Sequence, residues 1–144
     1  MLAIVDSGGA NIASVRFALE RLGVRSELTA DPAVIRSAER VILPGVGSAQ
    51  EGMKRLQAKA LVDCVRSLTQ PVLGVCLGEQ LLFDSSEEGD TPSLGLIPGR
   101  VARLPESPGI TVPHMGWNTL EVRRDTPLLA GIPRDARFYF VHSY

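Results

Sequence analysis

The sequence is poor in cysteine and in net charge. Cys64 and Cys76 are its only cysteines among 144 residues; two are too few for a disulfide framework, and their separation does not fit the paired ligands of a zinc site. Fifteen Lys and Arg balance sixteen Asp and Glu, for a formal net charge of −1. This balance gives no electrostatic footprint for nucleic acid or an anionic membrane. We expect no metal site and no nucleic-acid partner, and we assign no cofactor.

Long hydrophobic runs are absent as well. No apolar stretch reaches the roughly 20 residues that span a bilayer, and the short apolar run after Met1 has no basic region before it, as a signal peptide would. We therefore expect a cytoplasmic protein without membrane contact. A length of 144 residues and a hydrophobic content of 44% suit one globular domain over residues 1–144, which can bury about two-thirds of the surface of its unfolded chain.

Short apolar runs alternate with amphipathic segments through the first 86 residues. We expect four strands, at residues 2–5, 25–28, 41–43 and 71–75. We expect four helical segments, at residues 11–22, 32–38, 49–67 and 76–86. In the first and third of them, apolar residues recur every three or four positions. This alternation favours an α/β fold, a doubly wound, mostly parallel sheet with helices on both faces.

The composition changes after Gly89, where prolines and glycines break the sequence into short pieces. Alternating patterns predict strands at residues 100–104 and 119–122, and an aromatic strand at residues 137–141. We expect a small antiparallel addition to the fold in this C-terminal third.

A cysteine lies at a predicted strand-to-helix turn. Residues 74–78 have the form G-x-C-x-G with Cys76 at the centre, which is the nucleophile elbow with sulfur in place of oxygen. Strand and helix pass so closely there that glycine is required on both sides of the nucleophile. The N–H of Leu77 is a ready donor to an oxyanion, and a thiol at the positive end of a helix ionises more readily.

The alternative interpretation makes Cys76 a small buried apolar residue whose glycines only permit tight packing. Cys64 differs, because it falls on the apolar stripe of a predicted helix, where we expect a structural role.

A second glycine-rich loop follows the predicted strand at residues 41–43. Gly45, Val46 and Gly47 lie in it, and the carboxyl ends of neighbouring parallel strands share one crevice. Glycines let a backbone N–H turn toward a reacting carbonyl, so this loop is a candidate second oxyanion donor. Taken alone, it also fits an ordinary turn.

Residues 44–47 and 74–80, with the order of strands around them, resemble the class I (triad) glutamine amidotransferases. The resemblance covers essentially the whole chain and implies a flavodoxin-like fold. It also implies hydrolysis of glutamine through a cysteine thioester, with the ammonia passed to a partner. Residues 6–11, 113–118 and 140–144 are similar to the glutaminase subunits that supply ammonia to a barrel-shaped cyclase subunit in histidine biosynthesis.

The resemblance assigns roles residue by residue. It implies that Cys76 is the nucleophile and that Leu77 and the loop at residues 44–47 supply the oxyanion donors. The implied substrate contacts are Gly78, Gln80, Ser143 and Tyr144. The implied contacts with the TIM-barrel cyclase are Asn11, Met115, Gly116, Trp117 and Asn118.

Some positions depart from the family pattern. Glu79 stands where the family usually has an uncharged residue, and Ser7 and Ala10 replace its usual Tyr and Gly. The family takes its general base from a His-x-Glu motif, which the resemblance places beyond residue 144. We therefore expect the sequence to be the amino-terminal part of such a glutaminase and not to turn over glutamine alone. A Cys76–His142 dyad is the alternative, since His142 ends a predicted strand.

Two other functions remain open. A cysteine hydrolase or chaperone of the DJ-1 type uses the same kind of elbow but expects a histidine soon after the cysteine. A non-catalytic flavodoxin-like binding module would use Ser7, Gly8 and Gly9 to hold a phosphate at a helix N-terminus.

Overall fold

The computed structural model describes residues 1–9 and 12–144. The chain forms two compact units, Met1–Ala102 and Arg103–Tyr144, and each is described by itself. That residues 1–144 make one domain stays a prediction.

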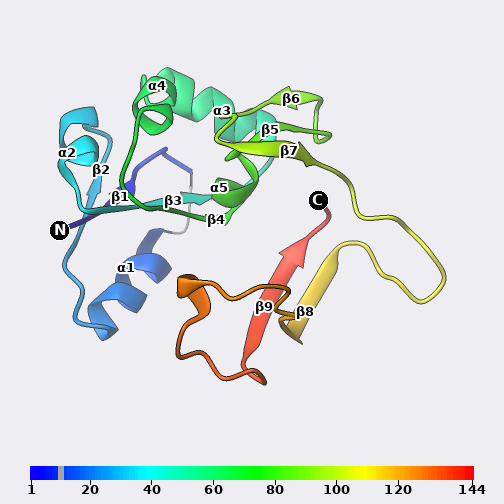
Figure 1. Cartoon of the computed structure of the whole chain (residues 1–144). Helices are drawn as coiled ribbons and strands as arrows, with labels where there is room; N and C mark the ends of the chain where they lie inside the picture. The colour runs from blue at the N-terminus through cyan, green and yellow to red at the C-terminus, as the bar shows by residue number, and fades with distance from the viewer. Residues whose placement is uncertain (10–11) are drawn as a thin grey trace. The chain divides into compact units, whose positions relative to one another are not determined.

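The first unit is built on a four-stranded parallel sheet (Figure 1). Its strands are β1 (Leu2–Val5), β2 (Ser26–Thr29), β3 (Arg40–Gly45) and β4 (Val72–Cys76). Their order is β2-β1-β3-β4, and every neighbouring pair is parallel. The four strands expected from the sequence are thus confirmed, and the parallel pairing of β3 with β4 brings their carboxyl ends together.

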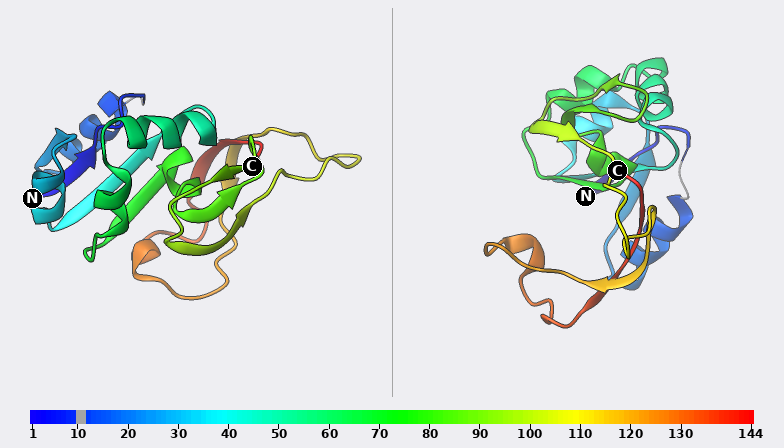
Figure 2. Two further views of the ribbon diagram at one scale, coloured as in Figure 1. Left: turned by 90° about the horizontal axis from the view of Figure 1, so that it is seen from above. Right: turned by 90° about the vertical axis from the view of Figure 1, so that its right-hand side faces the viewer.

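Helices lie on both faces of this sheet. They are α1 (Ile12–Arg21), α2 (Pro32–Ser37), α3 (Ala49–Ala58) and α4 (Val62–Arg66). Figure 1 and the right-hand view of Figure 2 show α3 and α4 on one side of the sheet and α1 on the other. Alternate strand residues such as Val5 and Leu43 join the core with Ile35 and Leu56, whereas the intervening Ile4 is equally buried outside that cluster. Burial on both faces explains the continuous apolar runs of β1 and β3.

The prediction of one long helix at residues 49–67 is wrong. The structure ends α3 at Ala58 and starts α4 at Val62. Ala60 takes a positive φ of 54°, which no α-helix contains. The break turns the chain so that Leu61 and Cys64 are both buried, and this burial outweighs the uninterrupted helical pattern.

The helix expected from residue 76 to about 86 is also wrong. It is the short α5 (Leu77–Gln80). The chain then forms a separate three-stranded sheet of β5 (Phe83–Ser86), β6 (Thr91–Pro92) and β7 (Ile97–Val101), in the order β6-β5-β7. β7 pairs with β5 in parallel, so the antiparallel strand expected at residues 100–104 is misplaced. The Gly99 N–H donates to the Asp84 carboxylate (2.9 Å), a pairing that local patterns do not reveal.

The second unit contains an antiparallel pair, β8 (His114–Thr119) and β9 (Arg137–His142), and a single 3-10 turn, η1 (Pro127–Leu129). The small antiparallel addition is confirmed, but the strand expected at residues 119–122 is wrong. Thr119 pairs with Arg137, the first residue of β9, so residues 120–122 have no partner strand. Within the described parts of the chain, no helix has the length and apolar character to cross a membrane.

Candidate active site

Cys76 occupies a strained turn between β4 and α5. Its φ of 56° and ψ of −123° lie in a region that non-glycine residues rarely enter, at a cost of order 1–3 kcal/mol. The side chain is exposed, and the helix begins at the next residue. The turn therefore presents the thiol to solvent at the carboxyl end of the sheet, as a nucleophile elbow requires.

The glycines on either side of Cys76 are required by close backbone contacts. A β-carbon on Gly74 would lie 2.3 Å from the Glu79 α-carbon, and one on Gly78 would lie 1.8 Å from the Leu43 carbonyl oxygen. Both neighbours are main-chain atoms that cannot move aside without displacing β3 or α5. This confirms the close strand-to-helix approach predicted from the G-x-C-x-G motif.

The loop after β3 begins beside the cysteine. Gly45 is the register partner of Cys76, and a β-carbon on Gly45 would lie 2.7 Å from the Gly78 nitrogen. Val46 follows with its side chain 42% exposed, and Gly47 has a φ of +90°. The structure thus brings Gly45, Leu77 and Gly78 together around Cys76. Their roles toward an oxyanion or substrate stay predictions.

Gln80 and Asn11 are the other predicted site residues of this unit. Gln80 ends α5 and is half-buried. Asn11 lies outside the described residues. In the turn after β1, the Gly8 N–H donates to the Asp6 carboxylate (2.9 Å), so one of the N–H groups that the binding-module interpretation gives to a phosphate already has an acceptor.

Cys64 is buried in the core, with 1% of its surface exposed. Its Sγ lies 3.7 Å from the Pro32 carbonyl oxygen. Burial raises the pKa of the Cys64 thiol because desolvation disfavours the thiolate. Its position agrees with the structural role expected from the sequence, and the two cysteines therefore have opposite surroundings.

The β8–β9 hairpin exposes apolar side chains on one face. Met115 and Trp117 alternate along β8 opposite Val141 and Tyr139, and each is at least half exposed. The Trp117 and Tyr139 rings meet edge to face, 5.4 Å between centroids. Four predicted partner contacts, Met115, Gly116, Trp117 and Asn118, therefore lie on one strand. Whether they meet a partner stays a prediction.

The two histidines form a pair across the hairpin. Nδ1 of His114 lies 3.0 Å from Nε2 of His142, and Nδ1 of His142 lies 2.7 Å from the Tyr144 carbonyl oxygen. A carbonyl only accepts, so His142 donates from Nδ1 and accepts from His114 at Nε2. Sequence reasoning missed this pair, which follows from their facing positions in the register.

The end of the chain is held within the second unit as well. The Leu104 N–H donates to the Ser143 carbonyl oxygen (2.8 Å), and Ser143 and Tyr144 are half-buried. Their predicted contacts with substrate are not tested by these positions.

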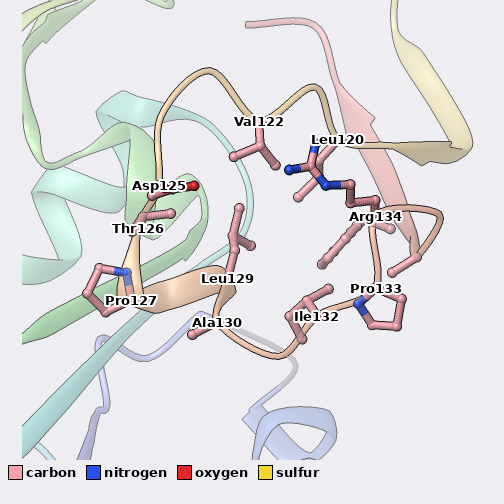
Figure 3. Close-up of a pocket in the computed structure, with 12 residues that line it drawn as sticks. Leu120, Val122, Asp125, Thr126, Pro127, Leu129, Ala130, Ile132, Pro133 and Arg134 are labelled. Carbon is pink, nitrogen blue, oxygen red and sulfur yellow. The ribbon is translucent and has the colours of Figure 1, made fainter.

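A pocket of about 510 Å³ lies in the second unit, and sequence reasoning did not find it. Figure 3 shows Val122 and Leu129 pointing toward each other across it. Its lining is mainly apolar and includes no cysteine or histidine. Among the residues that the structure describes, no cluster of three or more His, Cys, Asp or Glu could hold a metal ion.

Comparisons with known proteins agree with this geometry. Residues 3–144 match the family model "Glutamine amidotransferase class-I". The imidazole glycerol phosphate synthase subunit HisH of Xylella fastidiosa (strain Temecula1) is 57% identical over 143 residues, which is 99% of this chain and 72% of that protein. HisH of Xanthomonas axonopodis pv. citri is 56% identical with the same coverage. A crystal structure of a glutamine amidotransferase superposes with a TM-score of 0.70 at 21% identity, covering 98% of this chain and 70% of that one, which shows the shared fold.

Proposed function

Because the chain belongs to the class I glutamine amidotransferase family, we propose that it is the glutaminase part of imidazole glycerol phosphate synthase. In this function it hydrolyses glutamine and supplies ammonia to the cyclase subunit for histidine biosynthesis. The homology to HisH supports the subunit, and the elbow supports the chemistry. A biosynthetic enzyme of this kind acts in the cytoplasm.

The reaction uses the thiolate of Cys76. The sulfur attacks the side-chain amide carbon of glutamine, and a tetrahedral oxyanion forms. Collapse of this intermediate breaks the C–N bond, and the departing nitrogen takes up a proton and leaves as ammonia. A glutamyl thioester remains on the sulfur. Water then hydrolyses the thioester, which releases glutamate and regenerates the thiol. N–H groups of Leu77 and of residues 45–47 would stabilise the oxyanion.

Substrate and partner contacts complete the proposal. Gly78, Gln80, Ser143 and Tyr144 would contact glutamine, as the family resemblance implies. Asn11 and the exposed face of β8 would meet the TIM-barrel cyclase. The large exposed Trp117 suits this role, since aromatic residues are enriched at protein interfaces.

A general base must take the thiol proton and return it to the ammonia. His142 does not suit this task, because both of its ring nitrogens already have partners in its own unit. We therefore propose that His142 is not the base but a scaffolding residue for the substrate loop, the role that the family resemblance implies for it.

The observation that carries the proposal is the strained, exposed Cys76 between two glycines that tolerate no side chain. Its test is glutamate release from glutamine, measured with and without the cyclase subunit. We expect Cys76→Ala to abolish release under every condition in which the unchanged protein is active. Cys64→Ala is the matched control and should retain it.

His142→Ala decides between the two interpretations of that histidine. Loss of turnover with an unchanged thermal midpoint would make His142 the base and refute our assignment. Turnover that persists in Cys76→Ala would refute the nucleophile.

A further inference from the structure

One cation of α3 reaches the loop that we assign to the oxyanion. The Nη2 group of Arg55 donates to the Val46 carbonyl oxygen at 2.7 Å. A β-carbon on Gly47 would lie 3.7 Å from the same nitrogen, so Arg55 lies along the Val46–Gly47 peptide. A hydrogen bond from a guanidinium is charge-assisted and stronger than one between neutral groups.

The guanidinium of Arg55 lies directly beside Gly9 in the turn after β1. A β-carbon on Gly9 would lie 2.5 Å from both Cζ and Nε of Arg55, so glycine at this position makes room for the cation. Nε is fully buried and has no acceptor among the described residues. One helical turn later, Lys59 donates to the Asp6 carbonyl oxygen at 2.8 Å. Arg55 of α3 and Lys59, the residue after α3, therefore contact the loop after β3 and the turn after β1.

The peptide geometry links this contact to catalysis. In a trans peptide the C=O and the following N–H lie in one plane and point in opposite directions. The contact that fixes the Val46 oxygen therefore also fixes the direction of the Gly47 N–H. Gly47, with its φ of +90°, has little intrinsic preference that would hold this plane, so the restraint must come from outside the loop.

We propose that Arg55 is a positioning residue that orients the oxyanion loop through the Val46 carbonyl, and that Gly9 gives it access. The inference rests on the proposed function, because it concerns the same oxyanion donors. Arg55 contacts neither the thiol nor the substrate in this role. It preorganises a main-chain donor, and such donors contribute only when negative charge develops on the substrate oxygen.

The test compares two reagents that both modify Cys76. The γ-p-nitrophenyl ester of glutamate acylates the thiol: an S–C bond forms, the ester C–O bond breaks, and nitrophenolate leaves with the electron pair without needing a proton. This reaction passes through a tetrahedral oxyanion. Iodoacetamide alkylates the same sulfur by displacing iodide and forms no oxyanion. Nitrophenolate absorbance reports the first reaction, and mass spectrometry reports the second.

We expect Arg55→Met to slow acylation roughly tenfold, less than the 10²–10³-fold cost of deleting an oxyanion donor. The iodoacetamide rate should stay within about twofold, since it does not use the oxyanion donors. Arg55→Lys, which keeps a cation, should restore part of the acylation rate. Gly9→Ala should slow acylation by displacing the guanidinium, and it should add nothing to Arg55→Met. Lys54→Met is the matched control, because Lys54 is an exposed lysine of the same helix that approaches Glu51 on the helix surface (3.8 Å).

Other outcomes would contradict either the Arg55 assignment alone or the proposed function as well. Equal acylation of Arg55→Met and the unchanged chain would overturn the Arg55 assignment alone, as would faster acylation or an equal loss with iodoacetamide. If iodoacetamide labels Cys76 in the unchanged chain but the ester does not acylate it, the proposed function falls and the Arg55 assignment falls with it.

Discussion

Gly45, the last residue of β3, is the register partner of Cys76, the last residue of β4. The two strands therefore end side by side, and the loop after β3 begins where the thiol is presented. A β-carbon on Gly45 would approach the first turn of α5 at Gly78. Strand β3, the loop after it and helix α5 thus meet around the Cys76 sulfur. A substitution at one of their glycines should therefore displace the neighbouring elements of the site.

Gly78→Ala should destabilise the first unit strongly. Its new methyl group would lie 1.8 Å from the Leu43 carbonyl oxygen, so β3 and α5 must separate, at a cost of about 3 kcal/mol or more. Gly23→Ala is the control: Gly23 also has a constrained backbone (φ 69°) but nothing within 4 Å, and we expect a loss of about 1 kcal/mol. Urea unfolding of the two variants measures the difference, and equal losses would contradict the close contact.

The two cysteines should differ in reactivity toward iodoacetamide. Cys76 is exposed and Cys64 is buried, and alkylation requires an accessible thiolate. We expect native protein to be labelled at Cys76, with Cys64 labelled only when urea unfolds the chain. Peptide mass spectrometry after timed labelling separates the two sites. Rapid labelling of Cys64 without urea would contradict its place in the core.

Stability should decline at alkaline pH partly through Cys64. Burial raises the pKa of its thiol in the folded protein, whereas in the unfolded chain the thiol ionises near pH 8.5. The stability that Cys64 contributes through this pKa difference is complete below the pKa of the unfolded chain. It is lost as the pH rises through the pKa of the folded protein, because the unfolded state then binds fewer protons than the folded state. Cys64→Ala should show a shallower decline in unfolding free energy between pH 8 and 10. Parallel curves for the two proteins would refute this linkage.

Trp117 should report partner binding. It is the only tryptophan in the sequence, and its side chain is 64% exposed, so its emission should be that of a hydrated indole. If β8 meets the cyclase, a 5-fluorotryptophan label should shift its ¹⁹F resonance when the unlabelled cyclase is added. Leu128→Ala is a comparison variant, because Leu128 is equally exposed but outside the predicted contacts. Binding without a resonance shift would place the interface elsewhere.

Much of the site could be predicted because its constraints are local. Glycine two residues before and two residues after Cys76 marks a turn in which backbone atoms nearly touch, and the structure shows those contacts. Strands β1 and β3 were predictable for a similar reason, since burial on both faces demands continuous apolar runs. The helix break at Ala60 was not, because the helical pattern continues through it and only the packing of Leu61 and Cys64 requires the turn.

By itself, then, the sequence determined the elbow, the apolar strands and the family resemblance, all of which depend on neighbouring residues. Only the tertiary structure decided which distant groups meet: Gly45 beside Cys76, His114 against His142, and Arg55 on the Val46 carbonyl between Gly9 and Gly47. Those contacts join residues from different strands, loops and helices. No spacing along the chain encodes them, because strand register and helix docking fix them only once the core is packed.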